Sequence, residues 1–308
     1  MIGTSSTRGM LGALAVLTLA ATTACSSAPD TGEDDRPVVL TTFTVLADIA
    51  ENVAGDRVRV ESITKVGAEI HGYEPTPGDL RRAADADLIL DNGLGLEAWF
   101  EKFVADIDVP HAIVSAGVET VDITEDEYAG LPNPHAWMSP LNAQIYAANT
   151  AEALAALDPD GAAEYHANAA AYSAELQELH DELVAGLARL PEGQRALVTC
   201  EGAFSYLTRD AGITEKYIWA VNAEQQATPQ QIASAIEFVR ERAVPAVFCE
   251  STVSDAPMRQ VEAATEARYG GTLYVDSLSE PGGPVPSYLE LIRHDIDTIL
   301  AGLTGQNR

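Results

Sequence analysis

Basic side chains are scarce in this 308-residue chain. It has 18 lysines and arginines against 47 aspartates and glutamates, and its formal net charge at pH 7 is −29. Proteins that bind nucleic acid obtain most of their affinity from contacts of basic side chains with phosphates. The composition therefore argues against nucleic acid as a partner. An acidic surface attracts cations, but it also keeps proteins in solution, so it does not by itself indicate a metal site.

The apolar run near the N-terminus is short. It covers residues 10–21 and follows Arg8. A bilayer-spanning helix needs about 20 apolar residues, so this run is too short to be one. A charged start followed by a short apolar centre is the pattern of a secretory signal. We therefore expect residues 1–24 to be removed as a signal peptide.

The residues after this run resemble a bacterial lipobox, in which a cysteine is acylated and becomes the new N-terminus. The segment 22–27 reads TTACSS, and Thr22 departs from the leucine usual at that position. We expect Cys25 to carry lipid and to anchor the protein to the outer face of the cytoplasmic membrane. Residues 25–37 are rich in Ser, Asp, Pro and Gly, as a flexible tether would be. The alternative is an ordinary signal peptide with a chance cysteine.

Cysteine is rare as well, with three residues in the whole chain. Once Cys25 is set aside, Cys200 and Cys249 form an even pair in an exported protein. Each ends a β-like run, so the two could face each other across neighbouring strand ends. Three alternatives stay open at this point: a disulfide, two buried thiols, and thiolates that bind a metal.

Motifs of familiar enzyme classes are missing. The chain has no H-E-x-x-H pair, and no Ser, Cys or Lys stands in a recognised nucleophile motif. His71 and Glu74 have an i,i+3 spacing, but Pro75 and Pro77 argue against a helix there. We predict that the chain is not an enzyme. The alternative is an exported metalloenzyme whose two histidines and carboxylate leave metal positions open.

Short apolar strands alternate with helical patterns, which predicts an α/β fold with parallel βαβ units. A long helix is predicted over residues 158–191, where apolar side chains recur on one face. Some thirty helical residues would form a rod on the order of 45 Å, which could connect an N-terminal lobe (38–157) to a C-terminal lobe (192–308). In the C-terminal lobe we expect helices at 229–242 and 256–269 and a strand at 272–275.

Four potential metal ligands occur at nearly even intervals: His71, His135, Glu201 and Asp276. Each lies in a loop-like motif, and the two carboxylates directly follow apolar strands, where α/β proteins bind ligands. Two imidazoles and two carboxylates suit a divalent metal of intermediate hardness. Taken singly, these residues have common structural roles too, since acids at strand ends often cap helices. We interpret the other histidines as bystanders and two tryptophans as core residues: His111, His166, His180, His294, Trp99 and Trp219.

Several motifs carry a resemblance to a known family. They are HGYEPTPGDL (71–80), NGLGLEAW (92–99), NPHAW (133–137), VTCEGAF (198–204), and YIW (217–219) followed by Thr228-Pro229. In this order they resemble the metal-binding lipoproteins of bacterial ABC importers for manganese, iron or zinc. The resemblance covers nearly the whole mature chain. It implies two α/β lobes, each with a mostly parallel sheet flanked by helices, joined by one long rigid helix, with the metal in the cleft between them.

The resemblance also implies a ligand set and a function. His71 and His135 would be the ligands of the N-terminal lobe, and Glu201 and Asp276 those of the C-terminal lobe. The protein would be a monomer that captures one divalent metal ion as cargo and delivers it to a membrane permease driven by a cytoplasmic ATPase. A surface adhesin lipoprotein with a vestigial metal site is a further alternative.

The ligand types favour manganese as the cargo. Three imidazoles and a His-rich acidic loop would indicate zinc, whereas residues 122–131 contain acids and no histidine. Two carboxylates make the ligand set harder, which suits Mn²⁺ or Fe²⁺. The pairing of Glu201 with the 217–219 segment also resembles the manganese-type branch of the family. We predict manganese first, iron second and zinc third.

Overall fold

The computed structural model describes residues 35–100, 107–125, 128–221 and 227–305. Contacts divide the chain after Asp35, and every helix and strand below belongs to the compact unit 36–308. The predicted signal peptide, Cys25 and nearly all of the predicted tether lie outside the described residues. Within the described ranges, no helix is both long and apolar enough to cross a membrane.

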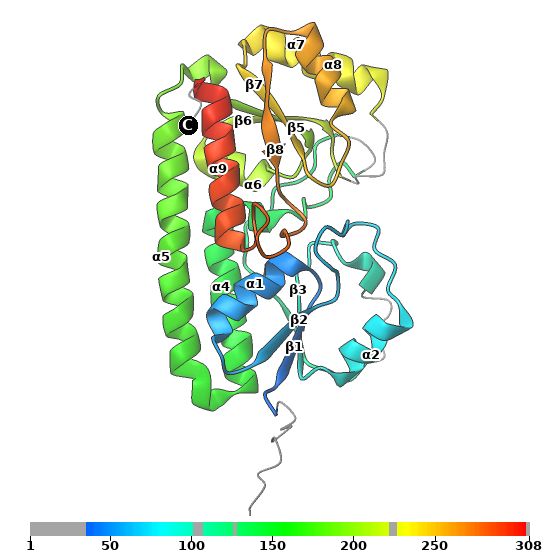
Figure 1. Cartoon of the computed structure of the whole chain (residues 1–308), viewed down its shortest axis with the longest axis vertical. Helices are drawn as coiled ribbons and strands as arrows, with labels where there is room; N and C mark the ends of the chain where they lie inside the picture. The colour runs from blue at the N-terminus through cyan, green and yellow to red at the C-terminus, as the bar shows by residue number, and fades with distance from the viewer. Residues whose placement is uncertain (1–34, 101–106, 126–127, 222–226, 306–308) are drawn as a thin grey trace, which may run out of the picture. The chain divides into compact units, whose positions relative to one another are not determined.

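The described part of the first half contains a parallel sheet of four strands (Figure 1). Its order is β2-β1-β3-β4, and the strands are β1 (Val38–Thr41), β2 (Arg59–Ser62), β3 (Leu88–Asp91) and β4 (His111–Ile113). The two central strands, β1 and β3, are apolar runs that are almost wholly buried, as strands of parallel sheets usually are. Helix α1 (Thr44–Ala54) connects β1 to β2, and α2 (Pro77–Asp85) connects β2 to β3.

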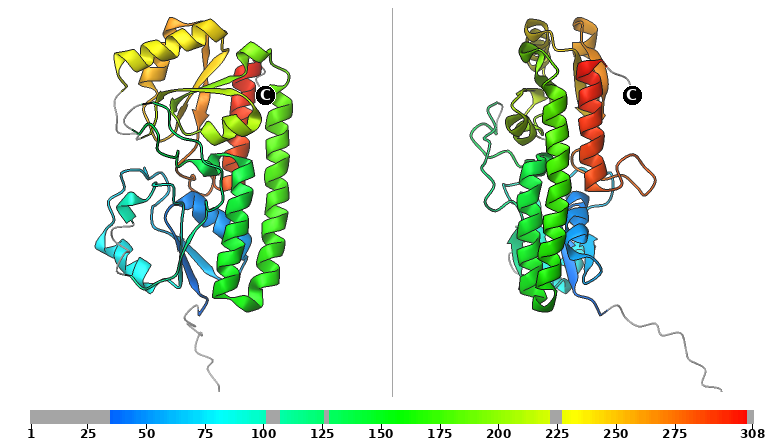
Figure 2. Two further views of the ribbon diagram at one scale, coloured as in Figure 1. Left: turned by 180° about the vertical axis from the view of Figure 1, so that it is seen from behind. Right: turned by 90° about the vertical axis from the view of Figure 1, so that its left-hand side faces the viewer.

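Two long helices follow the sheet and pack against each other. They are α4 (Pro140–Leu157) and α5 (Ala162–Leu187), separated by a short 3-10 segment at Pro159–Gly161. The 26 residues of α5 correspond to roughly 39 Å at 1.5 Å per residue. Figure 2 shows α4 beside one part of α5 and α9 (Tyr288–Thr304) beside another. Because α5 contacts α1 as well as α9, it connects the two halves.

The described part of the second half contains two parallel strand pairs. β5 (Ala196–Glu201) pairs with β6 (Thr214–Trp219), and β7 (Ala246–Glu250) pairs with β8 (Arg268–Leu273). β5 and β7 lie next to each other, and a disulfide joins Cys200 to Cys249 with 4.9 Å between their Cα atoms. Among the described residues, the remaining helices and 3-10 segments are α6 (Ser205–Ala211), α7 (Pro229–Arg242), α8 (Ala256–Ala264), Ala136–Met138 and Glu192–Gln194.

The predicted α/β class with parallel sheets is confirmed, and the differences are local. The pattern over 158–191 predicted one helix, whereas α5 covers 162–187 and Asp158 ends α4. Helix α4 was not predicted, because its many alanines are apolar on every face and give no clear stripe. The helix expected at 256–269 ends at Ala264, because the residues after it pair with β7. These residues form strand β8, which begins at Arg268 and not at residue 272 as expected.

One continuous apolar core runs through both halves. It contains buried residues of the first sheet, of α5 and of the second set of strands, among them Val39, Leu183 and Val247. Hydrogen bonds add to this contact: the backbone N–H of Leu278 donates to Thr44 Oγ1 at 3.0 Å. The segment before Leu278 is therefore held against the start of α1, and this brings the loops of the two halves together.

Candidate metal centre

His71 and His135 lie in two loops of the first half, with their imidazoles in contact. His71 stands between β2 and α2, and His135 directly precedes the 3-10 segment Ala136–Met138. Their Nε2 atoms are 3.0 Å apart, and the ring centroids are separated by 4.9 Å. Two imidazole nitrogens so close together either share a proton or face a common ligand.

Two carboxylates of the second half reach the same point. Glu201 is the last residue of β5, and Asp276 follows β8 by three positions. Glu201 Oε1 lies 3.4 Å from the Nε2 of His71 and 3.7 Å from that of His135. Asp276 Oδ1 lies 3.9 Å from each of these two nitrogens. The structure therefore brings together all four residues that the sequence singled out.

These separations fit a metal ion. Bonds of about 2.0–2.2 Å place neighbouring ligand atoms roughly 3.0–3.6 Å apart, depending on the geometry. The four donor atoms lie between 3.0 and 3.9 Å from one another in the pairs measured above. A metal ion held by the two histidine nitrogens would therefore lie within reach of both carboxylates.

The site is buried, and burial governs its electrostatics. The side chains of His135, Glu201 and Asp276 have no exposed surface, while His71 retains 7%. Burial, with a smaller effect of the nearby His71, lowers the pKa of His135 well below 6.5, so the ring is neutral and can bind a metal. Burial raises the pKa of Asp276, against an opposing effect of His71. Asp276 Oδ1 has no hydrogen-bond partner in the described part of the chain, and a cation would satisfy it.

Asn133 orients the ring of His135. Its Nδ2 donates to the carbonyl oxygen of Gly202 at 2.6 Å, so its Oδ1 faces the ring Nδ1 of His135 at 2.9 Å. An amide oxygen can only accept, which places the proton on Nδ1 and leaves the Nε2 lone pair directed at the site. Tyr206 of α6 donates to the carbonyl oxygen of Asn133 at 2.7 Å. The second half thus holds the loop that carries a histidine of the first.

Glu69 and Trp99 hold the loop that carries His71. The two carboxylate oxygens of Glu69 accept the backbone N–H groups of His71 at 2.7 Å and of Gly72 at 2.9 Å. The indole N–H of Trp99 donates to the carbonyl oxygen of Ile70 at 2.9 Å. Trp99 therefore supports the site and is more than the core residue that the sequence suggested.

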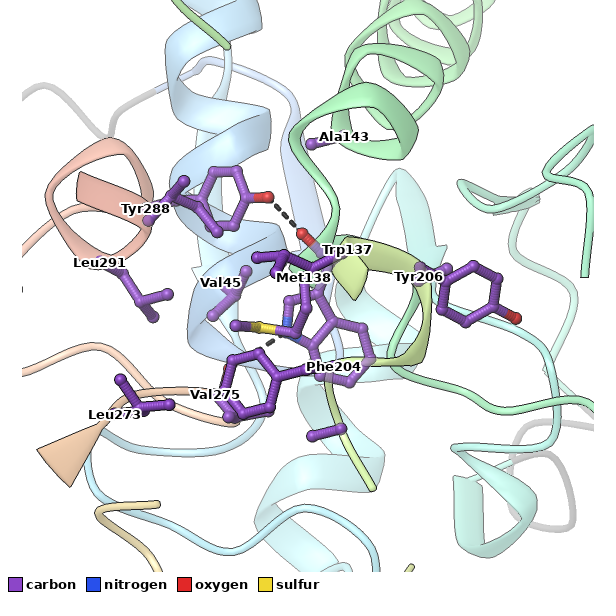
Figure 3. Close-up of a cluster of buried hydrophobic side chains, with 14 of the residues drawn as sticks. Val45, Trp137, Met138, Ala143, Phe204, Tyr206, Leu273, Val275, Tyr288 and Leu291 are labelled. Atoms are coloured by element: carbon purple, nitrogen blue, oxygen red, sulfur yellow. Dashed lines mark hydrogen bonds between the residues drawn. The ribbon is translucent and has the colours of Figure 1, made fainter. Parts of the chain in front are cut away.

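The segment of Asp276 is fixed by Trp137. Figure 3 shows this side chain within the buried cluster that also contains Val275 and Tyr288. The indole N–H of Trp137 donates to the carbonyl oxygen of Val275 at 3.0 Å, and Tyr288 donates its hydroxyl to the carbonyl oxygen of Trp137. The residue before Asp276 is therefore bound to the turn that follows His135.

Sequence reasoning missed two acids near the site, Glu69 and Glu250. Glu250 is buried at the end of β7, and its Oε2 accepts the backbone N–H of Glu201 at 3.1 Å. Burial raises the pKa of Glu250 to about 8. The sequence contained a signal for Glu250, because β5 and β7 both end in the dipeptide Cys-Glu and Glu250 therefore corresponds to Glu201. The paired cysteines form a disulfide in the structure, so they do not act as thiolate ligands.

The other histidines lie outside the groups of potential metal ligands found among the described residues. The imidazole of His111 stands 3.6 Å from a carboxylate oxygen of Asp91, and that of His166 stands 3.9 Å from one of Glu152. His294 packs its ring against that of Tyr274. His180 lies on α5. Trp219 is a core residue, as expected.

The sequence model of the family described as "Zinc-uptake complex component A periplasmic" matches residues 39–302. The chain belongs to this family of periplasmic metal-binding proteins. Among its relatives is the iron-binding protein YfeA of Yersinia pestis, which is 55% identical over 265 residues, covering 86% of this chain and 85% of YfeA. The manganese ABC transporter substrate-binding lipoprotein PsaA of Streptococcus pneumoniae serotype 4 is 36% identical over 304 residues, covering 95% of this chain and 98% of PsaA.

Solved structures of the family agree with the fold. The Mn-bound periplasmic metal binding protein of Candidatus Liberibacter asiaticus matches with a TM-score of 0.82 and 38% identity, over 87% of this chain and 100% of that one. The predicted family is therefore confirmed. Its members are named as substrate-binding proteins of ABC metal transporters, which agrees with the prediction of a binding protein and not an enzyme. Their names refer to zinc, iron or manganese, so the family does not decide the ion.

Proposed function

We propose that this chain is an extracytoplasmic lipoprotein that captures one divalent transition metal ion and delivers it to the permease of an ABC importer. The observation that carries the proposal is that one carboxylate oxygen each of Glu201 and Asp276 lies 3.4–3.9 Å from the two histidine nitrogens, which are themselves 3.0 Å apart. A metal bound there would connect the two halves. A permease could then distinguish the loaded form, in which the halves are held together, from the form without metal.

We propose His71, His135, Glu201 and Asp276 as the ligands and Mn²⁺ as the preferred cargo, before Fe²⁺ and Zn²⁺. Two carboxylates can each supply one or two oxygens, so the coordination number can exceed the four that Zn²⁺ prefers. The name of PsaA supports manganese as a cargo, and the name of YfeA supports iron. Because Zn²⁺ binds most N/O sites more tightly than Mn²⁺, affinity in vitro would not identify the physiological metal.

We propose further that the mature protein is a monomer and starts at a lipidated Cys25, which tethers the metal-binding unit to the outer face of the cytoplasmic membrane. The supporting observations are the lipobox-like sequence around Cys25 and the word lipoprotein in the name of PsaA. The proposed organisation keeps the predicted segments: signal peptide 1–24, tether 25–37, lobe 38–157, linking helix 158–191 and lobe 192–308.

The test is metal content and metal competition in wild type and in Asp276→Asn. We expect about one equivalent of metal in the wild-type protein purified without chelator, and an affinity for Mn²⁺ lowered by roughly tenfold or more in the variant. Asp295→Asn is a matched control, because Asp295 is equally buried but binds the backbone N–H of Tyr274. Deletion of the gene should reduce uptake of the physiological metal by cells. Binding that is indifferent to Asp276 would disprove the ligand set.

A further inference from the structure

A cavity of about 250 Å³ opens beside the proposed metal site. His71 is the single residue of the four proposed ligands that lines it. It is also the ligand with exposed surface, 7% of its side chain, whereas the other three have none. The walls of the cavity are largely apolar: Leu94, Leu96, Ile123, Leu131, Pro134 and Val221. Solvent therefore meets the site at His71, through an apolar passage.

We propose that this cavity is the route by which the metal ion reaches and leaves the site, and that His71 is the first ligand it meets and the last it leaves. This rests on the proposed function. It adds a path and an order of ligand exchange, which the four ligand positions alone do not define. Leu131, at the exposed side of the cavity, becomes a residue that sets the rate of exchange without being a ligand.

The size of the cavity suits a hydrated ion. Six water molecules at about 30 Å³ each occupy roughly 180 Å³, which is less than the 250 Å³ available. The apolar side chains that line most of the cavity supply no oxygen to replace a lost water, so the ion keeps most of its inner water shell until it reaches His71. An ion that gives up water reluctantly, such as Mg²⁺, would gain no ligand on the way. The passage therefore favours transition metals that exchange water for imidazole.

One wall of the cavity is held rigidly. Gly93, Leu94 and Gly95 have φ values of 74°, 56° and 81°, and leucine is uncommon in this left-handed region. Such a conformation persists only where the surroundings fix it. The buried carboxyl group of Glu97 does so, because its oxygens accept the backbone N–H groups of Asn92 at 2.6 Å and of Gly93 at 3.1 Å.

The same network connects this wall to the site. The side-chain N–H of Asn92 donates to the carbonyl oxygen of Pro134, the residue before His135, at 3.0 Å. Tyr146 of α4 donates its hydroxyl to Asn92 Oδ1 at 2.6 Å. Leu94 and Pro134 thus line the cavity at positions that the packing of α4 determines, so the passage is preformed on this side.

Leu131, another residue that lines the cavity, offers a place for an experiment. Leu131 is 53% exposed, so a larger side chain there can be accommodated without disturbing the core. Its neighbour Pro132 forms an antiparallel bridge with Asp122, which holds the backbone at this point. Leu131→Trp should narrow the passage, and Leu131→Ala should widen it. Neither replacement touches a proposed ligand.

The experiment measures the rates of metal exchange in the purified full chain. Stopped-flow mixing with Mn²⁺ gives the association rate, and mixing of the loaded protein with excess EDTA gives the dissociation rate. An obstacle on the route raises the barrier in both directions and leaves the equilibrium unchanged. We expect Leu131→Trp to slow both rates about tenfold with the same dissociation constant, and Leu131→Ala to leave them equal or faster. Val184→Trp is the matched control, because Val184 is an exposed apolar residue on α5, away from the cavity, and its rates should equal those of wild type.

Two outcomes would overturn the route. Rates in Leu131→Trp equal to those of wild type would show that the ion does not pass Leu131. A slower dissociation alone, with tighter binding, would show that position 131 stabilises the loaded state and does not line the path. Absence of binding of Mn²⁺, Fe²⁺ and Zn²⁺ in wild type would instead disprove the proposed function, so the two failures are distinguishable.

Discussion

The indole N–H of Trp137 donates to the carbonyl oxygen of Val275 at 3.0 Å, across 138 positions of sequence. Trp137 follows His135 by two positions, and Val275 directly precedes Asp276. One side chain of the first half therefore positions a proposed ligand of the second. Tyr288, at the start of α9, binds the carbonyl oxygen of Trp137 and extends the connection (Figure 3).

Replacement of Trp137 should lower the free energy of unfolding by more than the loss of side-chain volume alone would. Trp137→Phe leaves the buried carbonyl of Val275 without its donor, which costs about 1–3 kcal/mol in the free energy of unfolding. It should also weaken metal binding. Trp219→Phe is the control, because its indole N–H has no hydrogen-bond partner within the described residues. Guanidinium titration of the metal-free proteins measures the difference, and equal losses in both variants would assign the effect to volume alone.

Loss of the side chain that orients His135 should weaken metal binding. Asn133→Ala removes the acceptor for the ring N–H of His135, and such changes typically cost about 10–100-fold in metal affinity. Asn149→Ala is a suitable comparison, because Asn149 also bonds to backbone carbonyls, those of Val114 and Ala116, but away from the site. Competition titrations against a chelator give both affinities. Unchanged affinity in Asn133→Ala would mean that the ring needs no orienting partner.

The stability of the metal-free protein should fall as the pH rises through the range in which Glu97 titrates. Burial raises the pKa of Glu97 from 4.5 to about 8. Between these values the folded state holds a proton that the unfolded state has lost, so rising pH favours unfolding. Buried Glu250 adds to the effect, with its pKa raised to about 8.

Glu97→Gln isolates the contribution of this carboxyl group. The variant should lose up to about 1.4 kcal/mol per pH unit of the dependence seen in wild type. Glu241→Gln, at an exposed position of α7, should leave that dependence unchanged. Free energies of unfolding at pH 5.5 and pH 8.5 give the comparison. An equal change in the free energy of unfolding between these two pH values in wild type and in Glu97→Gln would show that Glu97 does not cause the pH dependence.

Reduction of the disulfide should lower stability. The bond joins Cys200 to Cys249, which are 49 positions apart. For a loop of that size the entropy lost by the unfolded chain corresponds to about 4 kcal/mol. Guanidinium unfolding with and without reductant measures the loss. The double variant Cys200→Ser, Cys249→Ser should be equally destabilised and indifferent to reductant; a reductant effect in that variant would point to another cause.

The proposed lipid anchor predicts a change of location. In Cys25→Ser the acylation site is missing. Because no acyl chain then holds the protein at the bilayer, it should leave the membrane fraction. Ser27→Ala should remain with the membrane. Fractionation and the mass of the N-terminal peptide provide the readout. Membrane retention of Cys25→Ser would indicate an uncleaved signal segment.

The fold was predictable where the pattern is local. Helix α7 begins and ends at the predicted residues 229 and 242, because Thr228 and Gln231 form a capping box before an apolar stripe. Strand β8 was less predictable, since its sequence RYGGTL contains two glycines and becomes a strand by pairing with β7. The end of the predicted helix 256–269 was wrong for the same reason.

The sequence by itself determined the chemistry of this protein: which side chains can bind a metal, which strand ends carry them, and which family the motifs resemble. The tertiary structure decided how these parts meet. It placed the nitrogens of His71 and His135 3.0 Å apart, directed Asn133 at His135, and left an apolar cavity beside His71 alone. These distances and contacts depend on how segments far apart in the sequence pack against one another. Short-range sequence patterns do not contain this information, because each distance is set by the shared core and not by neighbouring residues.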